Sequence, residues 1–181
     1  MASQRDAIPL LVEQHRQIAD LFRRTIDATG RERRRNFRRL RRLVVAHETA
    51  EELLIHPRVR WIDHDGDELA RARVEEETRL KAELAALLSM DADSAEFTAG
   101  LAAGRALAQT HNNAEEATEF ALLADTLDER GRRRLARRVR FVEAVAPTRP
   151  HPALALGGEN LLAGGFTAIA DRARDLIERP R

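Results

Sequence analysis

The chain lacks two residue types that often carry metal and redox chemistry. Its 181 residues include no cysteine, so disulfides, thiolate metal sites and cysteine nucleophiles are excluded. There is no tyrosine either, which removes phenolate ligands and tyrosyl radicals. Any site that this chain builds must therefore rely on other side chains.

Long apolar runs are also missing. No apolar stretch approaches the length that spans a membrane, and the first residues, Met-Ala-Ser-Gln-Arg-Asp, contain no signal-peptide core. From these absences we expect a soluble, cytoplasmic protein with no membrane partner.

Lysine is nearly absent, and arginine is concentrated in two runs. Lys81 is the single lysine among 31 Lys and Arg residues. Eight arginines fall within residues 31–42 and seven within residues 130–140, although the net charge is only +1. On a helix, Phe37, Leu40 and Val44 would take the inner face of the first run and leave arginine outside. Because no nucleic-acid-binding motif accompanies the runs, we expect a solvated or docked face and no nucleic-acid partner.

The composition and the spacing of apolar residues predict an all-α fold. Ala, Leu, Arg and Glu dominate, and a chain of this length forms a single domain. Four segments carry apolar residues at helical period, and short connections favour antiparallel up-down neighbours. We predict helices over residues 6–28, 32–56, 63–88 and 93–127. Gly30 would close the first, Pro57 would end the second, and Asp91 or Asp93 would cap the fourth.

Three regions follow from this reading. Residues 1–128 form the four-helix bundle, and residues 129–146 form a fifth, very basic helix. Residues 147–181 form a tail, with a short helix near residues 166–178 that packs on the bundle.

A short motif occurs twice. Residues 47–52 read His-Glu-Thr-Ala-Glu-Glu and residues 111–116 read His-Asn-Asn-Ala-Glu-Glu. A further ligand-type residue precedes each copy by about thirty positions, His15 before the first and Glu77 before the second. Residues four apart share a helix face, so each motif points one imidazole and one carboxylate into the same space.

These residues lie where the apolar rows of their own helices place the core. Buried histidine and glutamate are costly unless they are paired, hydrogen-bonded or bound to metal. One such residue is readily explained as a satisfied polar group, but six of them, with a set on each of four helices, predict a metal site. Mixed ligands of this kind suit iron, manganese or zinc, and bridging carboxylates suit a pair of metals. The six predicted ligands are His15, His47, Glu51, Glu77, His111 and Glu115, with Glu51 and Glu115 as the bridges.

With this pattern the chain resembles the hemerythrin-like proteins that contain the HHE cation-binding domain. The family carries a His on helix one, HxxxE on helix two, a His on helix three and HxxxE on helix four. His15, His47 with Glu51, and His111 with Glu115 match three of these four elements over residues 6–128. The tail Pro-Thr-Arg-Pro-His-Pro is similar to that of actinobacterial members. The resemblance implies a hemerythrin-like bundle with a di-iron centre, bridged by oxo or hydroxo and by two carboxylates.

Two positions depart from the family pattern. Glu77 stands where the third-helix His is expected, if Leu80, Leu84 and Leu87 set the register, although Glu75 and Glu76 are close by. A third carboxylate would favour ferric iron and redox turnover over reversible oxygen carriage. His56, before Pro57, is a further candidate ligand, and a helix-capping histidine is the alternative reading.

The resemblance also implies a small-molecule ligand: hydrogen peroxide, dioxygen or nitric oxide. The leading hypothesis is catalase-like decomposition of peroxide by an enzyme whose metal ligands are its only catalytic groups. The alternatives are binding or sensing of oxygen, nitric oxide or iron without turnover, and a di-iron oxygenase acting on an organic substrate. A bundle whose polar core holds no functional metal is the remaining alternative. We expect a monomer or a small homo-oligomer.

Overall fold

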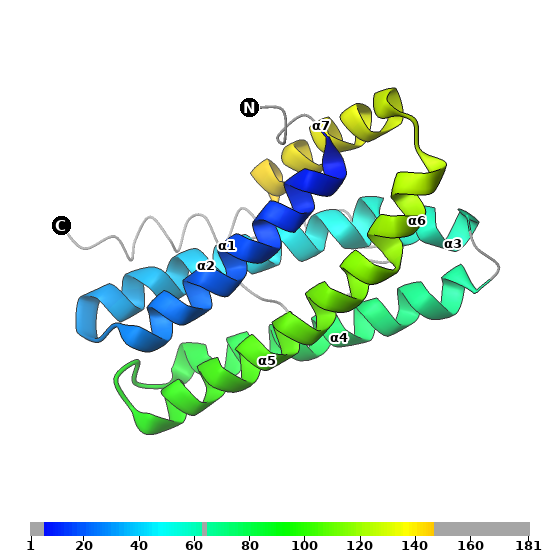
Figure 1. Ribbon diagram of the computed structural model, residues 1–181. Coiled ribbons are helices and arrows are strands. Elements are labelled where there is room, and N and C mark those ends of the chain that lie inside the picture. Colours follow the sequence, from blue (N-terminus) through cyan, green and yellow to red (C-terminus); the bar gives the residue numbers. More distant parts are fainter. Residues whose placement is uncertain (1–5, 63–64, 147–181) are drawn as a thin grey trace.

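The four segments with helical periodicity form the four long helices of the bundle. They are α1 (Ala7–Asp27), α2 (Gly30–Leu54), α4 (Gly66–Ala86) and α5 (Ala95–Ala117). A computed structural model describes residues 6–62 and 65–146 of the chain (Figure 1). The long helices alternate in direction, and α1 packs against α2 and α5 while α4 packs against α5 and α2. The predicted all-α, antiparallel four-helix bundle is confirmed.

Two of the predicted helices are interrupted. The second was expected to continue to residue 56, but α2 ends at Leu54 and the short helix α3 (His56–Ile62) begins directly afterwards. Pro57 lies in the first turn of α3, where its missing N–H costs nothing, and so it starts a helix instead of ending one.

The fourth predicted helix is divided at Thr118 into α5 and α6 (Glu119–Thr126). The Thr118 N–H is shared between the carbonyls of Ala114 and Glu115, and its hydroxyl also donates to the carbonyl of Ala114. The interruption leaves Thr118 exposed. Glu119 and Phe120 are buried in its place.

Helix boundaries also differ at the end of the bundle where α1 meets α2. Gly30 does not close the first helix, because α1 ends at Asp27 and Gly30 begins α2 with a φ of 55°, in the region that favours glycine. The cap of α5 is Ser94, whose side chain accepts the N–H of Phe97. Asp93, one of the two predicted caps, accepts the N–H of Gly30 instead and so connects the two loops.

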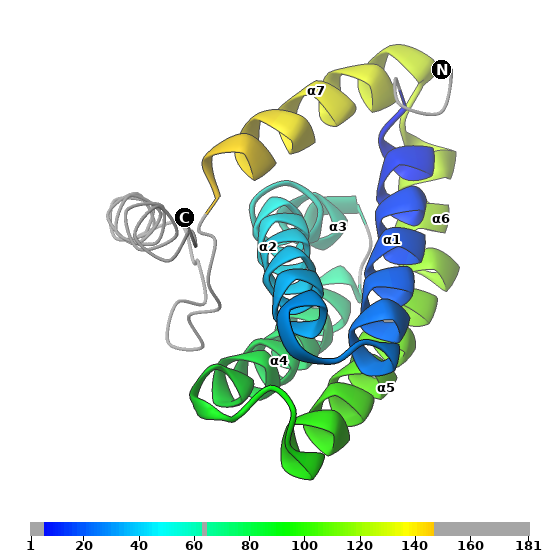
Figure 2. The ribbon, with the colours of Figure 1, turned by 90° about the vertical axis from the view of Figure 1, so that its left-hand side faces the viewer.

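The predicted basic helix forms as α7 (Glu129–Val145), with Asp128 as its N-cap. It crosses one end of the bundle and packs against α1 and α2 (Figure 2). Leu135, Ala136 and Val139 are its buried residues, and most of its arginines face solvent. The predicted short helix near residues 166–178 lies outside the described residues.

The arginine run on α2 is only partly solvated, so the prediction that arginine lies outside is wrong for two members. Arg33 and Arg41 are buried. The Arg33 guanidinium donates to the carbonyls of Ile26, Ala28 and Ala92. It thereby holds the α1–α2 turn against the segment before α5.

The apolar core is divided into two clusters along the bundle. One contains Leu11, Ile55, Phe120 and the buried face of α7, and the other contains Ile18, Val44, Leu80 and Ala108. Helices α1, α2 and α4 pass from one cluster to the other through a buried polar stretch, and so does the segment formed by α5 and α6. None of the helices within residues 6–62 and 65–146 is both long enough and apolar enough to cross a membrane.

Candidate metal centre

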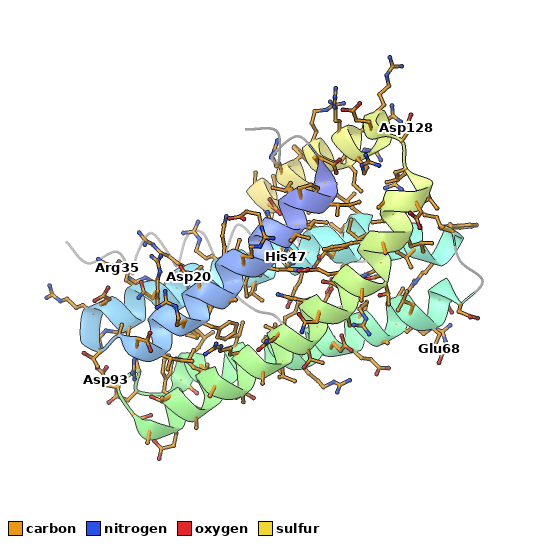
Figure 3. The ribbon with its side chains drawn as sticks, in the orientation of Figure 1. Asp20, Arg35, His47, Glu68, Asp93 and Asp128 are labelled. Atoms are coloured by element: carbon orange, nitrogen blue, oxygen red, sulfur yellow. The ribbon has the colours of Figure 1, made fainter. Side chains whose placement is uncertain are left out.

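All six predicted ligands lie in the polar stretch between the two apolar clusters. Their exposed fractions run from 0 to 4%, and they come from α1, α2, α4 and α5. Figure 3 shows His47 in the interior of the bundle, whereas Glu68 and Asp128 lie at its outside. We call this set the polar layer: His15, His47, Glu51, Glu77, His111 and Glu115.

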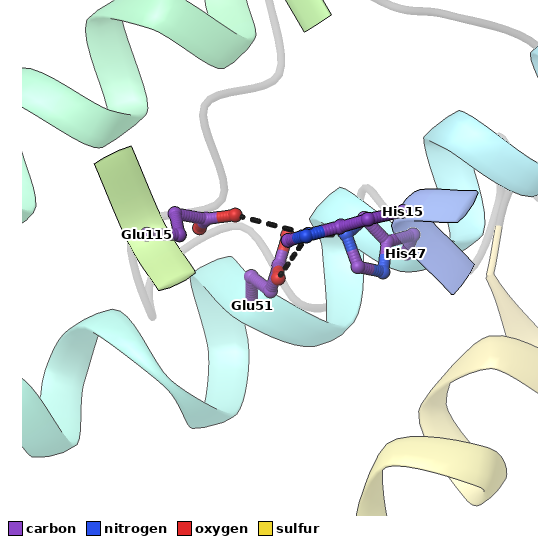
Figure 4. A group of neighbouring side chains, drawn as sticks. All are labelled: His15, His47, Glu51 and Glu115. Atoms are coloured by element: carbon purple, nitrogen blue, oxygen red, sulfur yellow. Dashed lines mark ion pairs between the residues drawn. The ribbon is translucent and has the colours of Figure 1, made fainter. Parts of the chain in front are cut away.

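One half of the polar layer joins α1 and α2 to α5. The Nε2 atom of His47 lies 3.1 Å from Glu51 Oε2. The Nε2 atom of His15 lies 3.3 Å from Glu115 Oε2 and 3.9 Å from Glu51 Oε1 (Figure 4). One ligand atom from each of the four residues falls within 4.8 Å of the others, a spacing that could hold a metal ion.

The other half joins α2 and α4 to α5. Glu51, Glu77, His111 and Glu115 also offer ligand atoms within 4.8 Å of one another. His111 Nε2 lies 3.3 Å from Glu115 Oε2. Glu51 and Glu115 therefore belong to both groups, and each is the carboxylate of one copy of the repeated motif.

Each histidine of the polar layer has a hydrogen-bonding partner at its Nδ1 atom. The partner of His15 is Glu116 at 2.8 Å, and the partner of His111 is Glu76 at 3.1 Å. His47 Nδ1 lies 2.9 Å from the side-chain oxygen of Gln14. Outer partners of this kind fix the ring orientation and tautomer of histidines that bind metal through Nε2.

Of the glutamates that follow the two motifs, only one supports a histidine. Glu52 and Glu116 occupy the same position in the two copies of the repeated motif. Glu116 does bond to His15, whereas Glu52 is buried and pairs with Lys81. Gln14 and Glu76 were not recognised as histidine partners from the sequence.

The orientation of the Gln14 amide is itself determined by a residue of α7. The Gln14 nitrogen donates to Glu143 Oε1 at 2.7 Å, so its oxygen must face His47. An amide oxygen only accepts, and His47 Nδ1 must therefore carry the proton of this hydrogen bond. The Nε2 atom of a neutral His47 is then left with its lone pair directed at Glu51.

The inward atoms of the polar layer are buried without hydrogen bonds among the described residues. They are the Nε2 atoms of His15, His47 and His111 and both carboxylate oxygens of Glu51 and Glu115. Buried polar atoms without partners are rare because leaving them unpaired is costly. Nitrogen and oxygen donors that converge in this way fit a metal ion of the iron, manganese or zinc type.

The buried carboxylates and histidines of the layer shift one another's pKa values. Burial, together with the facing carboxylate of Glu115, raises the pKa of Glu51 well above its usual value. Burial lowers the pKa of His47. Burial acts to lower the pKa of His111, but the carboxylates of Glu115 and Glu76 outweigh the effect of burial and raise this pKa to about 9. Buried carboxylates that face each other are stabilised by a cation placed between them.

Glu77 is the residue of α4 that reaches the layer, as the register of Leu80 and Leu84 predicts. Glu77 is fully buried, Glu76 supports His111 from outside, and Glu75 is exposed. Unlike Glu51 and Glu115, Glu77 is already paired. Its Oε1 lies 2.7 Å from His56 Nε2, and its Oε2 lies 3.3 Å from Lys81 Nζ.

His56 joins the edge of the layer instead of capping α2. Its Nδ1 atom lies 3.0 Å from Glu119 Oε1, so both ring nitrogens contact carboxylates. Burial lowers the pKa of His56, but Glu77 and Glu119 outweigh it and leave the pKa well above the usual value. His56 also forms a third possible metal-binding group with Glu115 and Glu119.

Lys81, which stands out in the sequence only as the single lysine, lies beside the layer. Its Nζ atom contacts Glu52, lies 3.5 Å from Glu48 Oε2 and lies 3.3 Å from Glu77 Oε2. Burial acts to lower the pKa of Lys81, but Glu48, Glu77 and Glu52 raise it. Conversely, Lys81 and His56 lower the pKa of Glu77 against the effect of burial.

A sequence signal for two of the missed residues does exist. Glu119 follows Glu115 by four positions, and Lys81 follows Glu77 by four, so each pair shares a helix face. Neither Glu119 nor Lys81 contributes to an apolar row, so the helical periodicity of apolar residues does not single it out.

A helical bundle whose four long helices direct histidine and carboxylate side chains into one buried layer defines a class of metal-binding proteins. The chain matches the model of the hemerythrin HHE cation binding domain over residues 6–123. It therefore belongs to the hemerythrin HHE cation-binding family. No match was found among curated proteins or among solved structures.

Proposed function

We propose that the polar layer holds two iron ions and that the protein decomposes hydrogen peroxide. The observation that carries the proposal is the sharing of Glu51 and Glu115 by two groups of possible ligands. Two ions that lie side by side need carboxylates that reach both. In this assignment His15 and His47 would hold one ion, Glu77 and His111 would hold the other, and Glu51 and Glu115 would serve both.

Iron, when bound, supplies a redox couple and a Lewis acid for peroxide. The protein's own contribution is orientation and exclusion of water. Gln14, Glu76 and Glu116 direct three Nε2 atoms inward, and the apolar clusters close the layer at both ends. A mixed set of imidazole and carboxylate ligands suits iron, with manganese or zinc as the alternatives.

The three carboxylates of the set favour turnover over reversible oxygen carriage. Anionic oxygen donors stabilise ferric iron relative to ferrous iron. A protein that carries oxygen reversibly must keep a stable ferrous form, whereas peroxide decomposition requires the ferrous form only during turnover, when one peroxide reduces the iron and another oxidises it. The carboxylate of Glu77, which is fully buried beside Glu51 and Glu115, supports the enzymatic proposal in this respect.

The space that leads to the layer suits a small ligand. A cleft of about 230 Å³ between α1 and α5 reaches His15 and Glu116. Sites for larger organic molecules usually occupy about 300–1,000 Å³. The cleft therefore supports peroxide or a diatomic molecule over an organic substrate.

Binding or sensing without turnover is the second candidate. The polar layer lies between two apolar clusters, and a dry surrounding of this kind protects a bound diatomic molecule from side reactions. A reversible spectral change with oxygen or nitric oxide, without loss of peroxide, would favour this candidate.

An oxygen electrode separates these functions. Disproportionation releases one dioxygen for every two peroxide molecules consumed, whereas a peroxidase or an oxygenase releases none. We expect the iron-loaded protein to show this ratio and a Glu115→Ala variant to lack activity. Peroxide consumption without oxygen release would refute the catalase-like proposal, and absence of consumption would leave the binding function.

A further inference from the structure

Lys81 is the one lysine of the chain, and it is buried beside the polar layer. The other basic side chains among the 31 Lys and Arg residues are arginines, and many of them lie at the surface. Lys81 is 6% exposed and lies on α4, one helical turn after Glu77. A chain that uses arginine for its surface cations keeps lysine at this interior position.

The shape of the site accounts for lysine at this position. An ammonium is a compact point charge with three N–H donors, whereas a guanidinium is a planar fork. Three carboxylates surround the Lys81 nitrogen, those of Glu48, Glu52 and Glu77. The ammonium donates hydrogen bonds to Glu52 of α2 and Glu77 of α4, and Glu48 of α2 adds an ion pair at 3.5 Å.

Only one of these carboxylates belongs to the polar layer. Glu77 offers a ligand atom to the group formed with Glu51, His111 and Glu115, whereas Glu48 and Glu52 do not. The ammonium therefore contacts the metal centre through Glu77 Oε2 and is anchored to α2 on its other side.

We propose that Lys81 is a positioning residue for the metal centre: it holds Glu77 in place and offsets the negative charge that Glu77 adds. This inference rests on the proposed function, because it requires iron in the polar layer. A fixed positive charge close to a buried metal opposes the more highly charged ferric state. Lys81 therefore keeps the reduction potential of the iron higher than the carboxylates alone would allow.

The test is the midpoint potential of the iron-loaded protein with Lys81→Met, a neutral side chain of similar length. We expect the potential to fall, equivalent to a change of roughly tenfold or more in the ratio of ferric to ferrous affinity. Arg79→Met removes an exposed cation from the same helix and should leave the potential unchanged. An unchanged potential in Lys81→Met overturns the inference.

Lys81→Arg separates charge from packing. It keeps the positive charge but not the shape, so we expect a potential close to that of the wild type together with a lower thermal midpoint of the metal-free protein. If Lys81→Met does not fold, Lys81→Gln, a neutral polar side chain, replaces it, and an unchanged potential in Lys81→Gln overturns the inference. A fall of the potential in Lys81→Arg as large as in the neutral variant also overturns it.

The outcomes also separate this inference from the proposed function. A wild-type chain that takes up no iron refutes the proposed function. A wild-type chain that binds iron, with the same potential in Lys81→Met, refutes only the role of Lys81.

Discussion

The side-chain oxygen of Gln14 lies 2.9 Å from His47 Nδ1, and Glu143 of α7 holds the Gln14 nitrogen at 2.7 Å. This chain of contacts fixes the proton of His47 on the outer side of the ring. It also connects α7, which lies outside the repeated motifs, to the candidate metal centre. We therefore expect the metal affinity of the bundle to depend on residues that do not face the metal.

Gln14→Ala should weaken iron binding without removing a ligand. The loss of a hydrogen-bond partner behind a metal-binding histidine usually costs about 10- to 100-fold in affinity. Competition with a chelator of known affinity measures the change. Gln17→Ala, an exposed position on the same helix, is the control and should bind iron as the wild type does. Equal affinity in both variants would contradict the role of Gln14.

His47→Ala and Glu115→Ala should each lose metal, because each removes a buried donor of the polar layer. Glu115→Ala should lose more, since Glu115 belongs to both groups of ligands. Metal analysis of the purified variants gives the content per chain. His151→Ala, a residue outside the described part of the chain, and the exposed Glu68→Ala serve as controls. Equal metal content in all four would refute the assignment of the site.

Glu77→Ala tests the register of the third long helix. We expect the variant to lose about half of its iron, because Glu77 belongs to only one of the two groups. Glu75→Ala, at an exposed position two residues earlier, should retain both ions. Loss of iron in Glu75→Ala instead of Glu77→Ala would mean that α4 is rotated relative to the bundle described.

Metal removal should lower the thermal stability of the bundle. A ligand that binds only the folded state adds about 2.7 kcal/mol at a concentration 100 times its dissociation constant. Calorimetry with and without chelator should therefore show a lower midpoint for the metal-free protein. An identical midpoint in both would indicate a polar core that holds no metal.

The basic helix α7 should contribute to the stability of the bundle. Leu135 is 2% exposed and packs in the apolar cluster that contains Leu11 and Phe120. Leu135→Ala should destabilise the fold by about 2–5 kcal/mol, whereas the exposed Arg134→Ala should change stability little. Urea unfolding measures both, and a small effect of Leu135→Ala would mean that α7 is only loosely attached.

Much of the bundle could be predicted from the sequence, because helical periodicity is a local property. Leu80, Leu84 and Leu87 are all buried, and the row that they form led to Glu77 instead of its two neighbours. The repeated motif likewise placed Glu51 and Glu115 in one layer. In both cases the spacing along one helix was sufficient.

The helix interruptions and the charged network could not be predicted in the same way. The break at Ile55 directs His56 toward Glu77 and Glu119, which lie on other helices. The burial of Lys81 depends on Glu48 and Glu52 of α2. Contacts of this kind arise only when helices are packed together, and periodicity along a single helix contains no information about them.

Metal analysis of the wild-type chain determines whether the polar layer holds two iron ions. The protein would be produced with added iron, purified, and measured by plasma mass spectrometry against its concentration. We expect about two iron ions per chain, as for a two-metal site in a helical bundle. Little or no bound metal after iron supplementation would contradict this expectation and would leave the six buried residues as a polar core.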